Sequence, residues 1–327
     1  MTRGGIAVFS EVTAIRNIAD VPFPARIRNT PAEEKVYNSV NSLLNRIGGF
    51  ETVKISDMPA KRRFALAESG IITRECAEGK FGAVAFRKDG QLTVTVNGDD
   101  HIAERVMISG EDVFEAFKKL SELDKLILAN LRIARRGETF FTARPIDSGA
   151  GVRASVYVFA PILSSTRRII EIVKESAKIG VVVEETASES DLFLVKSAPI
   201  LGDKAERAIE SVAATVKKII EAEKAFRREY YIANKTALKD ECLRAVGVIK
   251  NCVRLSYAEM CELIGKIKLG IFFGFIKTDD EDALNELYFT AKTNMLSLLV
   301  PQSVTSDERR AILVKETAEK TNIRSER

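Results

Sequence analysis

The stretch "FGAVAFRKDGQLTVTV", residues 81–96, holds two short runs in which apolar and polar side chains alternate. Lys88, Asp89 and Gly90 stand between the runs, and Asp-Gly is a sequence that turns the chain tightly between two strands. Successive side chains of a strand point to opposite faces, so one face of each run is suited to a core. The stretch therefore predicts a β-hairpin, which is the unit of an antiparallel sheet.

The segments around this hairpin predict more strands and several amphipathic helices. Alternating or continuous apolar runs indicate strands at 6–12, 136–145, 152–160 and 180–185. Apolar residues at helical spacing predict helices at 31–47, 111–128, 161–179 and 203–230. Beyond residue 235 only helical periodicity remains. We therefore expect an α+β domain over residues 1–230, followed by a helical domain over residues 231–327.

Composition excludes several classes of protein. Of the 327 residues, 46% are apolar and 29% are charged, as in an ordinary globular protein. The net charge of +4 is spread among interleaved acids and bases, which argues against a nucleic-acid-binding surface. No apolar run is long enough to cross a bilayer, and no signal core opens the chain. One histidine and four cysteines without CxxC spacing predict no structural zinc and a reduced, cytoplasmic protein.

The strongest catalytic signal is "NGDDHI", residues 97–102, which directly follows the predicted hairpin. It combines two adjacent carboxylates with the only histidine of the chain, a set typical of acid–base chemistry. The same residues are equally suited to an ordinary turn between strands. The chain has no Walker loop, no GxGxxG turn and no nucleophile triad that would favour a different chemistry.

Five segments, taken in order, resemble the bacterial protein arginine kinases (McsB type) of the ATP:guanidino phosphotransferase, or phosphagen kinase, family. They are "VFSEVTAIRNIADVPFP" (8–24), "NGDDHI" (97–102), "RGETFFTARPIDSGAGVRASV" (136–156), "GVVVEETASES" (180–190) and "NCVRLSYAEMCELIGKIKLGIFFGFI" (251–276). The resemblance covers essentially the whole chain. It implies an antiparallel sheet of the glutamine synthetase/guanidino kinase type flanked by helices, with a helical C-terminal domain.

The family transfers a phosphoryl group from ATP to a guanidinium, and arginines neutralise the nucleotide phosphates. The family's Ser-Ser-Arg-x-Arg-x-x-Arg-Asn pattern stands here as "FSEVTAIRN" (9–17), so Glu11 and Thr13 replace both phosphate-facing arginines. Ala103 and Glu184 occupy two further arginine positions, and only Arg153 matches. An acid in place of a cation turns attraction into repulsion, on the order of 332/(εr) with an effective ε of about 20, which amounts to several kcal/mol.

The positions that would bind the guanidinium acceptor match the family pattern better than the phosphate-binding positions do. The family's Asn-Glu-Glu-Asp-His stands here as residues 97–101, which places Asp99 at the base position. The resemblance makes Glu189 the second guanidinium carboxylate. Arg144 occupies the position of the reactive-site cysteine, and in a rearranged geometry it is a further candidate for binding ATP phosphates. No residue is a candidate metal ligand.

The tail contains a further candidate site. The protein arginine kinases carry an Arg-Asp-x-x-Arg-Ala motif that binds phosphoarginine, and "SDERRA" (306–311) lacks only its first arginine. Asp307 and Arg310 are therefore candidate phosphoarginine ligands. The segment is equally well explained as a capped helix start, with acids in its first turn.

These replacements favour a pseudokinase over an enzyme. Such a protein would bind an active kinase partner, or arginine or phosphoarginine on client proteins. The alternative is an active ATP-dependent protein arginine kinase with a rearranged nucleotide site, and only in that case do ATP and Mg²⁺ take part. The resemblance also implies homodimerisation through the helical domain, where "IKLGIFFGFI" (267–276) is either an interface or a core helix.

Overall fold

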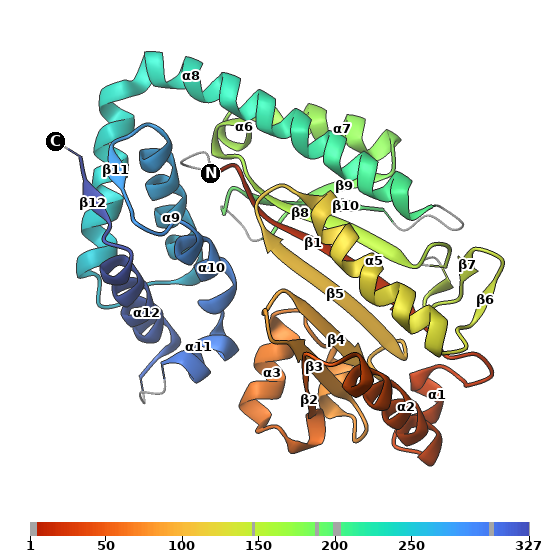
Figure 1. Ribbon diagram of the computed structural model, residues 1–327. Helices are drawn as coiled ribbons and strands as arrows, with labels where there is room; N and C mark the ends of the chain where they lie inside the picture. Colours follow the sequence, from red (N-terminus) through yellow and green to blue (C-terminus); the bar gives the residue numbers. More distant parts are fainter. Residues whose placement is uncertain (1–4, 146–147, 187–189, 199–203, 301–303, 327) are drawn as a thin grey trace.

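The computed structural model describes residues 5–145, 148–186, 190–198, 204–300 and 304–326. Within them, eight strands form one sheet in the order β2-β3-β4-β5-β1-β8-β10-β9, as Figure 1 shows. Every neighbouring pair is antiparallel. The strands are β1 (Ala7–Arg16), β2 (Phe50–Lys54), β3 (Ala83–Arg87), β4 (Leu92–Val96), β5 (Ile102–Ser109), β8 (Val152–Phe159), β9 (Val181–Glu185) and β10 (Leu192–Ser197).

The hairpin predicted at 81–96 is confirmed as β3 and β4. The strand predicted at 6–12 is longer, because β1 continues to Arg16 between β5 and β8. The strand predicted at 136–145 is mostly wrong, since regular pairing there is limited to β6 (Arg135–Arg136) and β7 (Thr139–Phe140). The central place of β1 brings Glu11 and Thr13 into the middle of the sheet.

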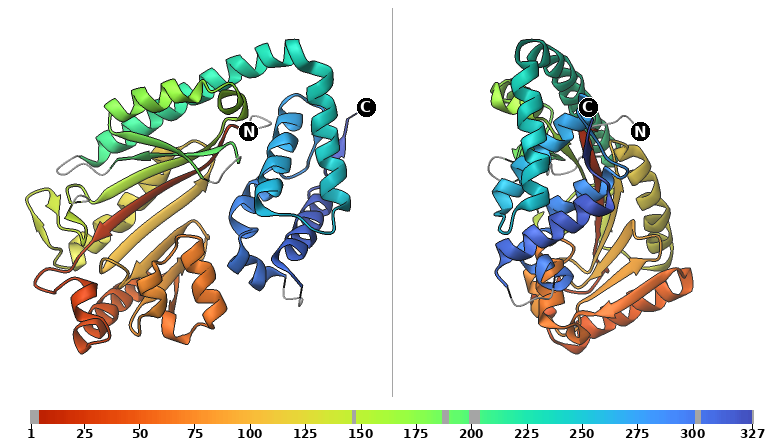
Figure 2. Two further views of the ribbon diagram at one scale, coloured as in Figure 1. Left: turned by 180° about the vertical axis from the view of Figure 1, so that it is seen from behind. Right: turned by 90° about the vertical axis from the view of Figure 1, so that its left-hand side faces the viewer.

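Helices cover one face of this sheet. They are α2 (Pro31–Ile47), α5 (Val113–Asn130), α7 (Ile169–Lys178) and the first half of α8 (Ala205–Asn251), and together they enclose the main apolar core. Figure 2 shows this layer across the back of the strands. Val12, Val106 and Val156 are fully buried beneath it, and burial of such a side chain stabilises the fold by about 1.5–3 kcal/mol.

The single helix predicted at 161–179 is divided into α6 (Pro161–Ser165) and α7. Arg167 between them has a positive φ of 58°, which is incompatible with a right-handed helix. A smaller layer covers the end of the sheet near β2 and β3. It consists of the 3₁₀ turn η1 (Ile55–Asp57), α3 (Ala60–Glu68) and α4 (Arg74–Glu78), packed around Ile55 and Val84. The short helix α1 (Pro24–Ile27) instead contacts α2 and contributes Ile27 to the main core.

The C-terminal part is helical. Helix α8 continues through a kink at Asn234 and is followed by α9 (Tyr257–Phe272), α10 (Asp282–Thr290), α11 (Thr293–Leu299) and α12 (Ser306–Lys320), with short strands β11 (Ile276–Lys277) and β12 (Arg324–Ser325). The apolar residues of "IKLGIFFGFI" mostly lie in the core of this part, so the core-helix alternative applies to them. The domain boundary expected after residue 230 falls inside α8 and stays a prediction.

Besides α8, several contacts join the helical part to the sheet part, and two of them border the open face of the sheet. Phe289 of α10 packs edge-on against Phe9, with ring centroids 5.4 Å apart. On the far side, Glu68 of α3 accepts hydrogen bonds from the backbone N–H groups of Asn294 (2.8 Å) and Met295 (3.3 Å) at the start of α11. The helical part therefore contacts both the start of β1 and helix α3. No helix in the described residues is long and apolar enough to span a membrane.

Candidate active site

A cavity of about 360 Å³ lies on the open face of the sheet, opposite the helices. Side chains from β1, β5, β8 and β10 form its floor, and residues 70–73, between α3 and α4, form one wall. Its charged lining residues are Glu11, Asp99, Asp100, Arg105, Arg144, Arg153 and Lys196. Most residues that the sequence singled out are thus brought to one place, although the chain separates them by more than a hundred positions.

Strand register explains the arrangement of the floor. Thr13 pairs with Arg105 on β5 and with Arg153 on β8, so one row across three strands carries two arginines. Ala103 lies two residues before Arg105 and therefore faces the same side. Sequence reasoning missed Arg105, although the two-residue period of a strand is a signal that it shares the face of Ala103.

The two acids that replace arginines are each paired with a cation. The Glu11 carboxylate accepts a hydrogen bond from Arg105 at 2.7 Å, and both side chains are largely buried. Burial lowers the pKa of Arg105, but Glu11 outweighs that effect, so the pKa lies above its ordinary value. Glu184 on β9 is 2.5 Å from Lys196 on β10, at a more exposed position. The expected repulsion is thus compensated inside the protein, and these two cations are engaged by acids.

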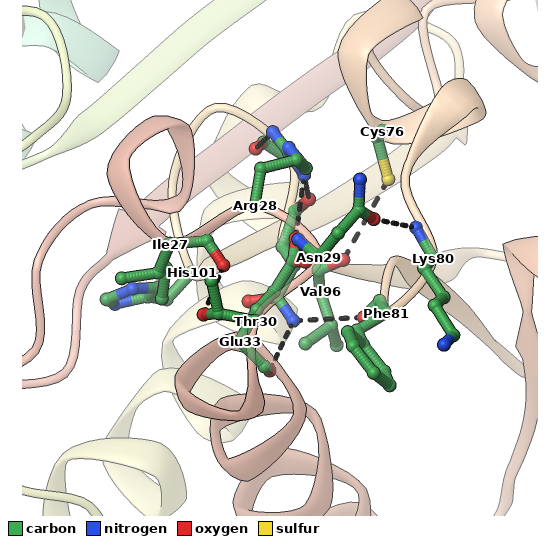
Figure 3. A network of polar contacts seen from close by, with 12 residues as sticks. Ile27, Arg28, Asn29, Thr30, Glu33, Cys76, Lys80, Phe81, Val96 and His101 are labelled. Atoms are coloured by element: carbon green, nitrogen blue, oxygen red, sulfur yellow. Dashed lines mark hydrogen bonds and ion pairs between the residues drawn. The ribbon is translucent and has the colours of Figure 1, made fainter.

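The turn at 97–101 is held from one side by Arg28, a residue that sequence reasoning also missed (Figure 3). Its guanidinium donates to the carbonyl oxygens of Asn97 (2.7 Å) and Gly98 (2.9 Å) and to the carboxylate of Glu33 (2.9 Å). Asn97 has a positive φ of 57°, and its side-chain amide donates to the carbonyls of Glu33 and Phe81. This network fixes the backbone immediately before Asp99.

His101 and Asp100 have supporting roles. Burial lowers the pKa of His101 to about 4, so the ring is neutral near pH 7. Its Nδ1 accepts from the N–H of Ile18 (3.1 Å), and its Nε2 donates to the carbonyl of Pro22 (3.0 Å). Asp100 is buried and accepts from Asn17 and from the N–H of Ala143, each at 2.6 Å. Asp100 lines the cavity, but its carboxylate is engaged by Asn17 and Ala143, so Asp99 stays the candidate base of "NGDDHI".

Asp99 is partly exposed at the cavity, and its nearest cation is Arg144, 3.4 Å away. Arg144 therefore lies on the acceptor side, whereas the sequence suggested it for the phosphates. Glu189, the second candidate carboxylate, lies outside the described residues. No group of three or more His, Cys, Asp or Glu within those residues could hold a metal ion.

The tail candidates take part in structural contacts. Arg310 is only 3% exposed, and it donates to the carbonyls of Leu255 (2.7 Å) and Ala291 (3.0 Å) and to Asp307 (2.9 Å). Thr305 and Glu308 form a complete capping box at the start of α12. In this conformation the Arg310 guanidinium connects α12 to the segments before α9 and after α10.

An antiparallel sheet with helices over one face and a cavity that joins a carboxylate turn to two arginines is the fold and site expected of a guanidino kinase. Residues 31–226 match the family model of the ATP:guanido phosphotransferase C-terminal catalytic domain, and residues 235–327 match that of the protein-arginine kinase McsB C-terminal domain. The chain belongs to the ATP:guanido phosphotransferase family, and within it the chain is a homologue of the protein-arginine kinases.

Known proteins show the extent of this similarity. The protein-arginine kinase of Geobacillus sp. (strain WCH70) is 28% identical, covering 95% of this chain and 90% of that protein. The one of Bacillus subtilis (strain 168) is 26% identical, covering 95% and 89%. Several solved structures share the fold, and two of them illustrate it. The duplicated taurocyamine kinase of Schistosoma mansoni with bound transition state analog components matches with a TM-score of 0.61 at 18% identity, over 79% of this chain and 39% of that one. Lombricine kinase matches with a TM-score of 0.58 at 17% identity, over 68% and 67%.

Proposed function

We propose that this chain is a pseudokinase of the protein-arginine-kinase type. It binds ATP weakly or not at all in the family's usual mode, and it acts by binding an active kinase partner or arginine or phosphoarginine on client proteins. The observation that carries the proposal is the ion pair between Glu11 and Arg105 in the middle of the cavity floor. A carboxylate stands where the family's phosphate-binding pattern has an arginine, and it engages an arginine of the neighbouring strand.

Charge in the cavity supports this proposal. Among the described lining residues, four cations stand with three carboxyl groups, which leaves little net positive charge for a triphosphate. Arginine binds phosphate through a rigid fork of N–H donors, and a fork already engaged by Glu11 gives up an existing contact before it accepts a new one. The residues present therefore fit the family's ATP-Mg²⁺ site poorly.

The alternative is an active protein arginine kinase, and one observation favours it. Arg105 and Arg153 flank Thr13 in a single row, so two arginines still reach the floor near the places where the family has them. If nucleotide displaced Glu11 from Arg105, a rearranged phosphate site would result. Asp99 would then be the base that accepts the guanidinium proton.

Thermal unfolding with ATP or ADP and Mg²⁺ distinguishes the two proposals. A ligand at one hundred times its Kd stabilises the folded state by about 2.7 kcal/mol, so an active nucleotide site gives a clear rise in Tm. The pseudokinase proposal expects no shift at millimolar nucleotide. It is wrong if the purified protein phosphorylates arginine in a generic protein substrate and Asp99→Ala abolishes that activity.

We also propose that the helical part, residues 231–327, mediates homodimerisation. Ile232 and Val253, on the second half of α8 and just after it, are 83% and 77% exposed. Apolar side chains exposed to this degree on the helical part support a contact surface there. Light scattering of the purified protein at micromolar concentration measures the oligomeric state. The proposal expects a dimer that Ile232→Glu weakens, and a monomeric wild type contradicts it.

A further inference from the structure

The loop that carries Arg144 is fixed to the turn that carries Asp99. Asn17 donates from its side chain to both the Asp100 carboxylate (2.6 Å) and the carbonyl of Phe141 (3.0 Å). The N–H of Ala143 donates to the same Asp100 oxygen at 2.6 Å. The hydroxyl of Thr142, one residue before Ala143, donates to the carbonyl of Arg144 at 2.6 Å. The backbone at Arg144 is therefore held in place by buried polar contacts, whatever its own side chain does.

The side chain of Arg144 then reaches the acceptor carboxylate. Its Nη2 atom is 3.4 Å from Oδ2 of Asp99, and both residues line the cavity. The contact is the same pair of chemical groups that an arginine ligand would form with Asp99, namely a guanidinium and a carboxylate. Arg144 is 66% exposed and Asp99 30%, so water screens the pair and the side chain can leave without disturbing the fold.

We propose that Arg144 is an internal stand-in for an arginine ligand. Its guanidinium occupies Asp99 from within the same chain, and an arginine side chain of a client binds only by displacing it. This inference rests on the proposed function, because it takes Asp99 as the place where client arginines bind. Because Arg144 is part of the same chain, it competes with external arginine side chains at a high effective concentration. The site therefore favours ligands that make further contacts over isolated arginine side chains.

The energetic scale of the competition follows from the exposure of the pair. An exposed ion pair changes an equilibrium by about two- to fivefold. Removal of the Arg144 guanidinium is therefore expected to tighten the binding of an external guanidinium by that factor. Removal of the Asp99 charge is expected to abolish binding with or without Arg144.

The experiment measures the affinity of N-acetyl-arginine amide by NMR titration at low ionic strength. Wild type, Arg144→Ala, Asp99→Asn and the double variant are compared, with N-acetyl-citrulline amide as the uncharged ligand control. Arg136→Ala is the matched protein control, because it removes one exposed arginine from β6, outside the cavity. Melting curves for all variants verify folding.

The inference expects Arg144→Ala to bind the arginine amide two- to fivefold more tightly than wild type, Arg136→Ala to match wild type, and both Asp99→Asn variants to lose binding. If Arg144→Ala binds as wild type does, or more weakly, while Asp99→Asn still abolishes binding, the stand-in is overturned and arginine binding at Asp99 remains. If no variant binds the arginine amide, both the stand-in and arginine-client binding at this site are wrong. These outcomes concern arginine binding alone. The conclusion about nucleotide binding depends on the thermal unfolding experiment with ATP or ADP.

Discussion

Glu11 and Arg105 lie on adjacent strands and form an ion pair of 2.7 Å at the centre of the cavity floor. They are separated by almost one hundred positions in the chain, and β1 and β5 bring them together. The pair joins a position where the family pattern has an arginine to an arginine that the pattern does not predict.

Glu11→Gln is expected to destabilise the fold while opening the floor to anions. The substitution leaves the largely buried Arg105 guanidinium without its carboxylate, which costs about 1–3 kcal/mol. Urea unfolding measures this cost. The freed guanidinium is also expected to bind inorganic pyrophosphate more tightly than in wild type, as measured by calorimetry.

Glu184→Gln is the matched control for that variant. It removes the same charge from the more exposed pair with Lys196, so a change below about 1 kcal/mol is expected. Equal destabilisation by both substitutions would contradict the special place of the Glu11–Arg105 pair. An unchanged pyrophosphate affinity in Glu11→Gln would show that the pair does not restrict anion binding.

Arg310→Ala is expected to destabilise the C-terminal helices by about 3 kcal/mol. It leaves two buried carbonyls and the Asp307 carboxylate without their donor. Arg309→Ala, at the neighbouring and less buried position, is expected to cost far less. Thermal unfolding compares the two. An Arg310→Ala protein with an unchanged Tm that no longer binds phosphoarginine would favour the ligand-binding explanation of Asp307 and Arg310 instead.

Glu104→Gln is expected to flatten the pH dependence of stability. Burial, and then the neighbouring Asp124, raise the pKa of Glu104 well above its ordinary 4.5. The folded chain therefore keeps a proton that the unfolded chain releases, and stability falls as pH rises above about 4.5, by up to about 1.4 kcal/mol per pH unit. Urea unfolding from pH 5 to 8 tests this, with Glu138→Gln on the surface as control. Parallel curves for Glu104→Gln and wild type would refute the assignment.

The contribution of His101 to stability is expected to rise with pH, opposite to that of Glu104, and His101→Gln tests this. Burial lowers the pKa of the folded-state imidazole from 6.5 to about 4, so between these values the unfolded chain binds a proton that the folded chain does not. Stability contributed by the neutral ring is complete above about pH 6.5 and is lost as pH falls towards 4, by about 3 kcal/mol in all. The difference in unfolding free energy between wild type and His101→Gln, measured from pH 4 to 7, should shrink as the pH falls. A constant difference would mean that His101 keeps an ordinary pKa.

The sequence predicted local elements well, and it predicted their lateral contacts poorly. The β3–β4 hairpin and helices α2 and α5 follow from side-chain period and turn residues, which act over short distances. The length of β1 was underestimated, although Val12 and Ala14 are buried while Glu11 and Thr13 line the cavity, which is the alternation that marks a strand. The break at Arg167 depends on a single backbone angle that arginine rarely adopts, and no residue pattern indicates it.

The sequence predicted many of the residues that form the candidate site, but not which of them form ion pairs with one another. Asp99, Arg153 and the acidic replacements were identified from motifs, and the fold brings the described ones to or beside one cavity. That Arg105 and Lys196 pair with the acids follows from strand order and register, which a single sequence does not contain. Arg28 was missed for a similar reason, since its role is to bind carbonyls of a turn about seventy residues away.

Val8 and Phe9 lie at the start of β1, and helices about 250 or more residues later in the sequence pack over them. Until α9 and α10 have been synthesised, the start of β1 lacks most of its apolar cover, and a nascent chain exposes it to chaperones or to other nascent chains. The sheet has all its strands by residue 197, but the burial of Val8 and Phe9 waits for α9 and α10. The order of synthesis and the order of folding differ in this protein, so that premature termination anywhere before residue 290 yields a chain whose central strand is exposed at one end.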